Sequence, residues 1–196
     1  LIIGVSLIFE NGRTEEIRKS FAETDVLWND ARFFNEYAAN ASASECGILM
    51  EENGKLGDRI YSEGLKIEVY ENANKLTDEI LTEKKRYALL DLQFWENSIS
   101  IKKKCGPQFS TVIYFYSQYN NTDNQKIEDK ILLNFKQRCG PKTIYVTFPV
   151  DMDLSSINIV RSLYNVTEIP SVVIDEKTVL PGVVSMDELN GIVHCW

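Results

Sequence analysis

The sequence predicts an α/β protein in which an all-helical N-terminal region precedes a mixed β-sheet with helices on both faces. Apolar residues recur at three- and four-residue steps through roughly the first 105 residues, which is the period of an α-helix. After Cys105-Gly106-Pro107, short apolar runs alternate with helical segments. Strands joined by a helical crossover lie parallel and strands joined by a tight turn lie antiparallel, so the sheet should contain both kinds of pair.

A first long helix is predicted from Thr14 to about Ala43. Its apolar residues fall on one helical stripe: Ile17, Phe21, Leu27 or Trp28, Ala31, Phe34 and Ala38. Thr14 is a suitable N-cap residue, and the two glutamates that follow it favour the positive end of the helix dipole. Cys46-Gly47 is expected to end this helical run of apolar residues.

Two further helical segments are predicted before the boundary at Cys105. A break at residues 53–57, which contain Asn53, Gly54 and Gly57, should precede a less regular segment at 60–73. A clearer helix should follow from Thr77, as its cap, to Ser98 or as far as Lys104. Five aromatic residues at helical spacing are interpreted as core or interface: Trp28, Phe33, Phe34, Phe94 and Trp95.

The rest of the chain predicts the element order βαβαββα. The expected strands are 111–116, 143–150, 171–174 and 179–184, and the expected helices are 123–138, 154–164 and 186–194. The last two strands are joined by a short turn at residues 175–177 and should be antiparallel. Three ranges are therefore expected along the chain: residues 1–13 as the end of an anchor or signal, 14–106 as a helical region, and 107–196 as an α/β domain.

Charge and composition argue against nucleic acid, metal and cofactor binding. A net charge of −8 does not favour a phosphate-binding surface, and the two basic runs, at residues 84–86 and 102–104, suit solvated faces or ends of helices. The single histidine, His194, and four widely spaced cysteines show no metal-ligand spacing. No paired carboxylates, phosphate-binding glycine loop or Ser/His/Asp set stands out, so no catalytic residue is assigned.

The apolar stretch from Leu1 to Phe9 is far shorter than the ~20 residues that a membrane-spanning helix needs. We hypothesise that it is the outer end of an N-terminal membrane anchor or uncleaved signal, with the remainder on the extracytoplasmic face of a membrane. The alternative is an ordinary buried strand or the start of a helix. Three glycosylation sequons support an exterior location only weakly, because a chain this rich in asparagine would show roughly two by chance.

The stretch from Tyr164 to Ile174, with Ile169-Pro170-Ser171 at its centre, resembles the thioredoxin family. In that family the matching Ile-Pro-Thr precedes the antiparallel strand, and the resemblance implies a cis peptide bond between Ile169 and Pro170. Gly182 and the segment that starts at Met186 look like the last strand and helix of the family. The resemblance covers about residues 109–196 and implies a thioredoxin-like fold.

The chain departs from the family at the redox-active position. Aligning residues 115–119 with the strand that precedes Cys-x-x-Cys places Asn120-Asn121-Thr122-Asp123 over the four active-site residues. Both cysteines are absent, and neither Asn120 nor Asp123 can form the thiolate that disulfide exchange requires. What remains at this position is a helix N-terminus with capping side chains.

The resemblance also implies a pairing of the cysteines. In a thioredoxin-like fold, the helix that ends near Cys139 and the final helix end at the same edge of the sheet, so we expect a Cys139–Cys195 disulfide far from the former active site. That leaves Cys46 to pair with Cys105. Each would close a loop of more than 50 residues, worth about 4 kcal/mol in the chain-entropy model. Other connectivities and reduced, buried cysteines are the alternatives.

The favoured hypothesis for function is a non-catalytic binding or scaffold module whose partner is a protein or an extended peptide. Thioredoxin-like domains hold extended peptides by main-chain hydrogen bonds beside the cis-proline loop. The residues expected to line this surface are Tyr119, Asn120, Asn121, Thr122, Ile169 and Pro170. The alternative is that these residues only close a turn. The N-terminal helices would supply a second interface or a tether.

Two other hypotheses stay open. One is an enzyme of the wider superfamily, either a thiol–disulfide oxidoreductase that uses unusual cysteines or a transferase that binds a thiol cofactor. Glutathione transferases place their helical domain after the thioredoxin-like one, whereas here it comes before. The other is a self-associating structural surface protein, in which the N-terminal helices form a coiled coil or bundle. The oligomeric state is left open by the sequence.

Overall fold

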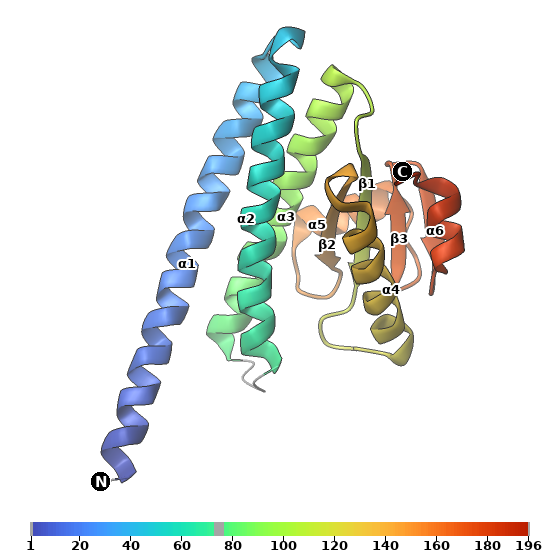
Figure 1. Ribbon diagram of the computed structural model, residues 1–196. Helices are drawn as coiled ribbons and strands as arrows, with labels where there is room; N and C mark the ends of the chain where they lie inside the picture. Colours follow the sequence, from blue (N-terminus) through green and yellow to red (C-terminus); the bar gives the residue numbers. More distant parts are fainter. Residues whose placement is uncertain (1, 73–76, 196) are drawn as a thin grey trace.

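Figure 1 shows a computed structural model of the chain, in which three long helices lie beside a smaller α/β region. The structure describes residues 2–72 and 77–195. The helical region consists of α1 (Ile2–Asn40), a short 3-10 turn η1 (Ala43–Glu45), α2 (Cys46–Asn72) and α3 (Asp78–Cys105). Successive helices run in opposite directions, and α3 packs against both α1 and α2 (Figure 1).

Three predicted features of the helical region are wrong. Cys46-Gly47 does not end the first helix, because Cys46 is the first residue of α2. The helix α1 begins at Ile2 and ends at Asn40, so Thr14 lies inside it and does not cap it. The helix α2 runs without a break through residues 53–57. Glycine at position 57 has a packing role, because a Cβ atom there would come within 2.7 Å of Phe94 Cζ on α3. Gly57 therefore lets two helices approach closely instead of interrupting one.

The predicted cap of the third helix and the predicted apolar stripe of the first are confirmed where the structure describes them. Thr77 caps α3, and its side chain accepts a hydrogen bond from the amide of Ile80 at 3.4 Å. The apolar stripe of α1 is buried at Leu27, Ala31 and Ala38. Phe94 and Trp95 belong to the core, and Trp28 and Phe34 are partly buried against it, whereas Phe33 is 71% exposed. The side chains of Ile17 and Phe21, and residue Ala73, lie outside the described part of the chain.

The α/β region has the predicted order βαβαββα. Its elements are β1 (Ser110–Tyr116), α4 (Asp123–Cys139), the 3-10 turn η2 (Gly140–Lys142), β2 (Thr143–Pro149), α5 (Ser155–Leu163), β3 (Ser171–Ile174), β4 (Thr178–Pro181) and α6 (Met186–Ile192). The final strand ends at Pro181, three residues earlier than expected. The peptide bond between Ile169 and Pro170 is cis, as the family resemblance implied.

The four strands form one mixed sheet in the order β2-β1-β3-β4. β1 and β2 are parallel, with Ser110 opposite Thr143 and Tyr116 opposite Pro149. β3 is antiparallel to both of its neighbours, and Phe115 of β1 lies opposite Ser171 of β3. The fold class is therefore α/β with a preceding helical region.

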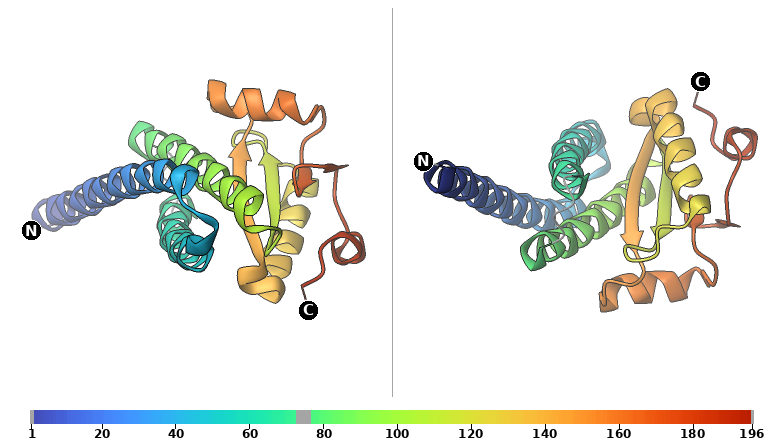
Figure 2. Two further views of the ribbon diagram at one scale, coloured as in Figure 1. Left: turned by 90° about the horizontal axis from the view of Figure 1, so that it is seen from above. Right: turned by 90° about the horizontal axis from the view of Figure 1, so that it is seen from below.

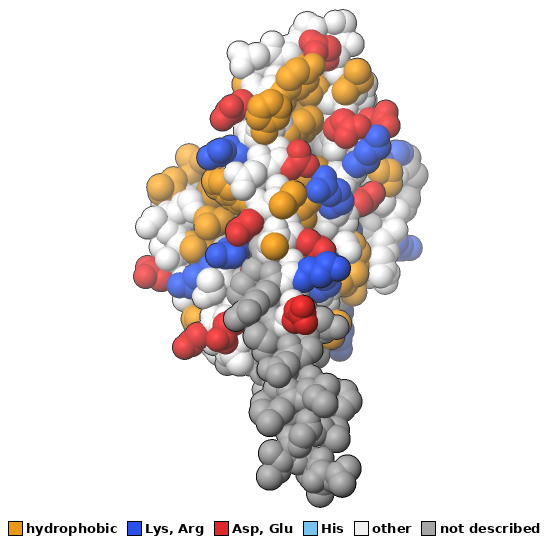
Figure 3. Space-filling view, turned by 90° about the vertical axis from the view of Figure 1, so that its left-hand side faces the viewer, with side chains coloured by type: hydrophobic (Ala, Val, Ile, Leu, Met, Phe, Trp, Pro, Cys, Tyr) orange, Lys and Arg blue, Asp and Glu red, His pale blue; other side chains and the backbone are white. Residues whose placement is uncertain are grey.

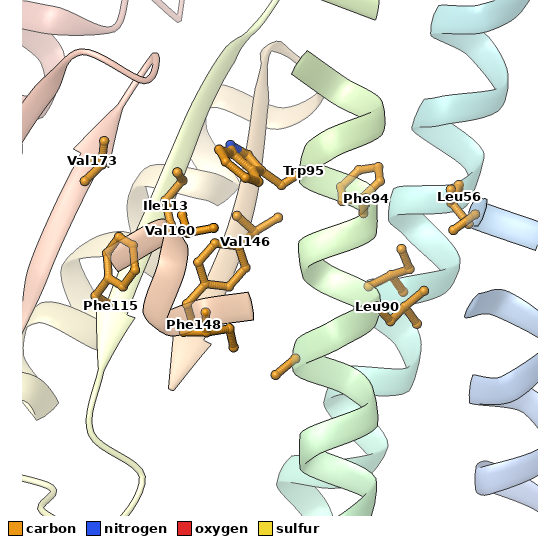
Figure 4. Packing of buried hydrophobic residues seen from close by; sticks show 14 of the residues in the cluster. Leu56, Leu90, Phe94, Trp95, Ile113, Phe115, Val146, Phe148, Val160 and Val173 are labelled. Carbon is orange, nitrogen blue, oxygen red and sulfur yellow. The ribbon is translucent and has the colours of Figure 1, made fainter. Parts of the chain in front are cut away.

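Alternate residues of the strands build two cores, one on each face of the sheet. On one face, α3 and α5 pack on Ile113, Phe115, Val146 and Phe148, and this core continues between the long helices through Phe94, Leu90 and Leu56 (Figures 2 and 4). On the other face, α4 and α6 pack on a second cluster that includes Val112, Tyr114, Leu132, Phe135, Val172 and Leu189 (Figure 2).

Polar contacts join the helical region to the sheet. The carboxylate of Asp91, on α3, accepts hydrogen bonds from Thr147 N at 3.0 Å and from Thr147 Oγ1 at 3.1 Å. Lys102, near the end of α3, donates to Asp175 Oδ1 at 2.8 Å in the β3–β4 turn. Trp95 Nε1 donates to Glu176 Oε1 in the same turn at 3.2 Å. These bonds and the shared core make α3 a structural part of the α/β region.

Both expected disulfides are present. Cys46 pairs with Cys105, with Cα atoms 5.6 Å apart, and Cys139 pairs with Cys195, with Cα atoms 4.7 Å apart. No cysteine is free among the described residues. Disulfides of this kind persist in oxidising environments and point to an extracytoplasmic location. Within residues 2–72 and 77–195, no helix combines the length and apolar character needed to cross a bilayer.

Candidate functional site

Three loops converge at the edge of the sheet where the parallel strands β1 and β2 end. Because Tyr116 lies opposite Pro149 and Phe115 lies opposite Ser171, the loops after β1 and β2 meet the loop before β3. Ligands of open α/β sheets bind outside the carboxyl ends of the parallel strands. We call the three loops, residues 117–122, 150–154 and 165–170, the carboxyl edge. The six predicted binding residues all belong to it: Tyr119, Asn120, Asn121, Thr122, Ile169 and Pro170.

Asp151 holds the loop that follows β1. Its carboxylate accepts hydrogen bonds from the hydroxyl of Ser117, from Gln118 N at 2.8 Å and from Tyr119 N at 3.1 Å. Burial raises the pKa of this carboxyl, but the three hydrogen bonds outweigh that effect and hold the pKa below its ordinary value. Asp151 is therefore ionised at neutral pH and fixes the main chain that leads to Asn120.

The far end of the same loop is fixed at the start of α4. Thr122 is the N-cap, and its side chain accepts a hydrogen bond from Gln125 N at 3.2 Å. The side-chain amide of Gln125 bonds back to the loop, accepting from Ser117 N and donating to Ser117 O, both at 2.9 Å. The predicted capping role of this segment is confirmed, and the loop is held at both ends.

Side chains at the tip of this loop face solvent. Tyr119 is 60% exposed, and Asn120, Asn121 and Thr122 are also exposed. This ordered loop, with an exposed aromatic ring and two amides, presents both apolar and hydrogen-bonding groups to solvent.

The loop before β3 offers main-chain groups. Pro170 is buried, and its carbonyl already accepts a hydrogen bond from Gly182 N at 2.9 Å. Ile169 is half-buried, and its amide and carbonyl have no hydrogen-bond partner in the part of the chain that the structure describes. Of the six predicted residues, Pro170 therefore cannot present its side chain, whereas Ile169 has a free main-chain donor and acceptor.

A charged cluster from the helical region reaches the carboxyl edge and was not predicted from the sequence. The ammonium of Lys84, on α3, donates to the carboxylate of Glu71, on α2, and to the side-chain oxygen of Gln118. Gln118 Nε2 also donates to Glu71 Oε1 at 3.0 Å. Burial lowers the pKa of Lys84 although Glu71 acts in the opposite direction. The loop after β1 is thus bonded to two helices that lie far from it in sequence.

The carboxyl edge carries no thiol group. None of residues 117–122, 150–154 and 165–170 is cysteine. Cys139 is the last residue of α4 and Cys195 follows α6, both away from the edge where α4 begins, and they are only 4% and 8% exposed. Within the described residues, no group of three or more His, Cys, Asp or Glu side chains is placed to hold a metal ion.

Comparisons with protein-family models, with curated proteins and with solved structures find no match for this chain.

Proposed function

We propose that this protein is a thioredoxin-like, redox-inactive binding module that holds an extended peptide at its carboxyl edge. The observation that carries the proposal is that the main-chain amide and carbonyl of Ile169 have no hydrogen-bond partner among residues 2–72 and 77–195, next to an ordered loop with an exposed aromatic residue, Tyr119. An extended peptide pairs with such groups through its own main chain, while side-chain contacts select its sequence. The element order βαβαββα and the sheet order β2-β1-β3-β4 support the thioredoxin-like assignment.

Titration with an unfolded polypeptide tests this proposal. The probe is reduced, carboxymethylated lactalbumin, and the readout is the protection of main-chain amides of the protein from hydrogen exchange. The proposal expects new protection at residues 117–122 and 167–169, and weaker binding for Tyr119→Ser. The matched control is Tyr37→Ser on α1, where the tyrosine is 48% exposed. Equal loss of binding in both variants, or protection only on the helices, would overturn the proposal.

The alternative of a thiol–disulfide oxidoreductase, or a related superfamily enzyme that uses unusual cysteines, has to employ one of the two disulfides. Catalytic cysteines need an accessible thiolate of low pKa, and Cys139 and Cys195 are buried. Alkylation of the native protein followed by non-reducing peptide mapping distinguishes such an enzyme from a redox-inactive binding module. We expect the pairs Cys46–Cys105 and Cys139–Cys195 and no alkylated thiol, and a rapidly alkylated cysteine would favour the enzyme.

Attachment to a membrane is a further part of the proposal. The apolar stretch from Leu1 to Phe9 supports it, and the two disulfides support an extracytoplasmic position. Alkaline carbonate extraction of membranes that contain the full gene product tests this point. Retention in the membrane pellet is expected, and release into the supernatant would contradict anchoring.

Self-association through α1 is a second candidate function, because the helix presents an apolar stripe to solvent. Val26, Phe33 and Tyr37 recur at helical spacing and are 61%, 71% and 48% exposed. Figure 3 shows apolar side chains gathered toward the upper end of this face. Sedimentation equilibrium decides between the candidates: a dimer that Phe33→Ser dissociates supports self-association, and a monomer excludes it.

A further inference from the structure

An open cleft lies at the edge of the sheet opposite the carboxyl edge. Its walls are the C-terminal end of α3, the segment that leads into β1, the end of α5 and the β3–β4 turn. The volume of the cleft is about 700 Å³. Pockets that hold small organic ligands have volumes of about 300–1,000 Å³, so the cleft has the size of such a site.

The cleft combines an apolar lining with a basic rim. Apolar and aromatic residues supply the lining: Trp95, Ile99, Pro107, Phe109, Leu163 and Tyr164. Four lysines and two carboxylates border it, whereas the whole chain carries a net charge of −8. Positive charge is therefore concentrated at this cleft, although the molecule as a whole is negatively charged.

Three of these lysines are available to a ligand. The ammonium of Lys102 is occupied, because it forms ion pairs with Asp175 at 2.8 Å and with Glu176 at 3.1 Å. Its single positive charge offsets one of the two carboxylates, so the four lysines and two carboxylates of the rim carry a net charge of +2. Lys103, Lys142 and Lys177 are exposed, and their ammonium groups form no ion pair or hydrogen bond with any residue in the ranges 2–72 and 77–195.

We propose that the cleft binds a small amphipathic anion, namely a carboxylate with an acyl or aromatic body. The apolar lining would bury the body of the ligand, and the free lysines would hold its anionic group at the rim. Charge complementarity selects an anion over a cation or a neutral molecule, and the size of the cleft suits a small molecule. This site is separate from the carboxyl edge and does not depend on peptide binding there.

The fluorescent aromatic anion 8-anilinonaphthalene-1-sulfonate serves as the probe, with decanoate as the competitor. We expect the native protein to bind one probe molecule per chain, and decanoate to displace it. Lys142→Glu combined with Lys177→Glu should weaken binding ~10-fold or more, because attraction to the anion becomes repulsion. The matched control reverses two exposed lysines of α4, Lys126→Glu with Lys130→Glu, and should leave binding unchanged.

A second pair of variants tests the apolar part of the cleft. Leu163 and Ile159 lie one turn apart on α5 and are both 68% exposed, but only Leu163 lines the cleft. Leu163→Ser should weaken probe binding several-fold and Ile159→Ser should not, and urea unfolding checks that both variants fold. The proposal is overturned if no saturable binding occurs, if decanoate fails to displace the probe, or if the variants and their controls weaken binding equally.

Discussion

Two buried carboxyl groups predict that the protein loses stability as the pH rises from 5 to 7.5. Asp91 is 3% exposed and Glu128 is fully buried. Glu128 Oε2 accepts a hydrogen bond from Val184 N at 2.8 Å, but Oε1 has no partner within the described chain. Burial raises the pKa of each carboxyl to about 7, against the opposing effect of the hydrogen bonds from Thr147 and Val184.

Proton linkage gives the direction in which stability changes with pH. In the unfolded chain both carboxyls ionise near pH 4, whereas in the folded protein they keep their protons to about pH 7. Between these values the native state binds more protons, so the free energy of unfolding falls as the pH rises. The full slope for one group is about 1.4 kcal/mol per pH unit, which gives a loss of roughly 2 kcal/mol for each group between pH 5 and 7.5.

Urea unfolding followed by circular dichroism at pH 5.0, 6.0 and 7.5 measures this loss. Asp91→Asn and Glu128→Gln cannot ionise, so each should flatten the pH dependence, and the double variant should flatten it most. Glu188→Gln is the control, because hydrogen bonds from Ser185 keep the pKa of Glu188 below its ordinary value, outside this pH window. A wild-type stability that stays constant or increases from pH 5 to 7.5 would refute the reasoning.

Three other predictions concern glycines, the carboxyl edge and a disulfide. Gly57→Ala should destabilise the protein by about 1–3 kcal/mol through overpacking against Phe94. Gly54→Ala should stabilise it by up to ~1 kcal/mol, because there is open space around the added Cβ atom. The urea midpoints of the two variants and the wild type measure both effects. Asp151→Ala should speed hydrogen exchange at the amides of Gln118 and Tyr119, which lose their acceptor, while the control Asp153→Ala should not. Replacing Cys139 and Cys195 by serine should lower stability by about 4 kcal/mol, less if the reduced chain keeps residual structure, and unchanged unfolding would contradict the pairing.

The α/β region was predicted well because its signals are local. Strand and helix boundaries follow from short apolar runs, from the capping side chains at residues 120–123, and from the short turn at 175–177. The disulfide pairing was also correct, but it depended on the family resemblance, since spacing alone allows three connectivities.

The errors arose where contacts between distant segments decide the structure. Gly54 and Gly57 suggest a break when α2 is considered alone, and only the position of Phe94 on α3 shows why glycine occurs at position 57. Lys84 and Glu71 reach Gln118 through packing that no local pattern reports. Asp151 could have been found, because a polar residue directly after a parallel strand lies where ligand sites form. Pro170 was expected to line a surface, but it is buried.

Asp91 also protects one edge of the sheet from pairing with an additional strand. β2 is one edge of the sheet, and an unprotected edge is a template for pairing with another chain and for aggregation. The amide of Thr147 points away from β1 and is already bonded to Asp91, so an incoming strand would have to displace a side chain of the core helix α3. The opposite edge, β4, spans only four residues and ends at Pro181, which has no amide to donate. The long helix α3 therefore hinders edge-to-edge pairing of β2 with a strand of another chain.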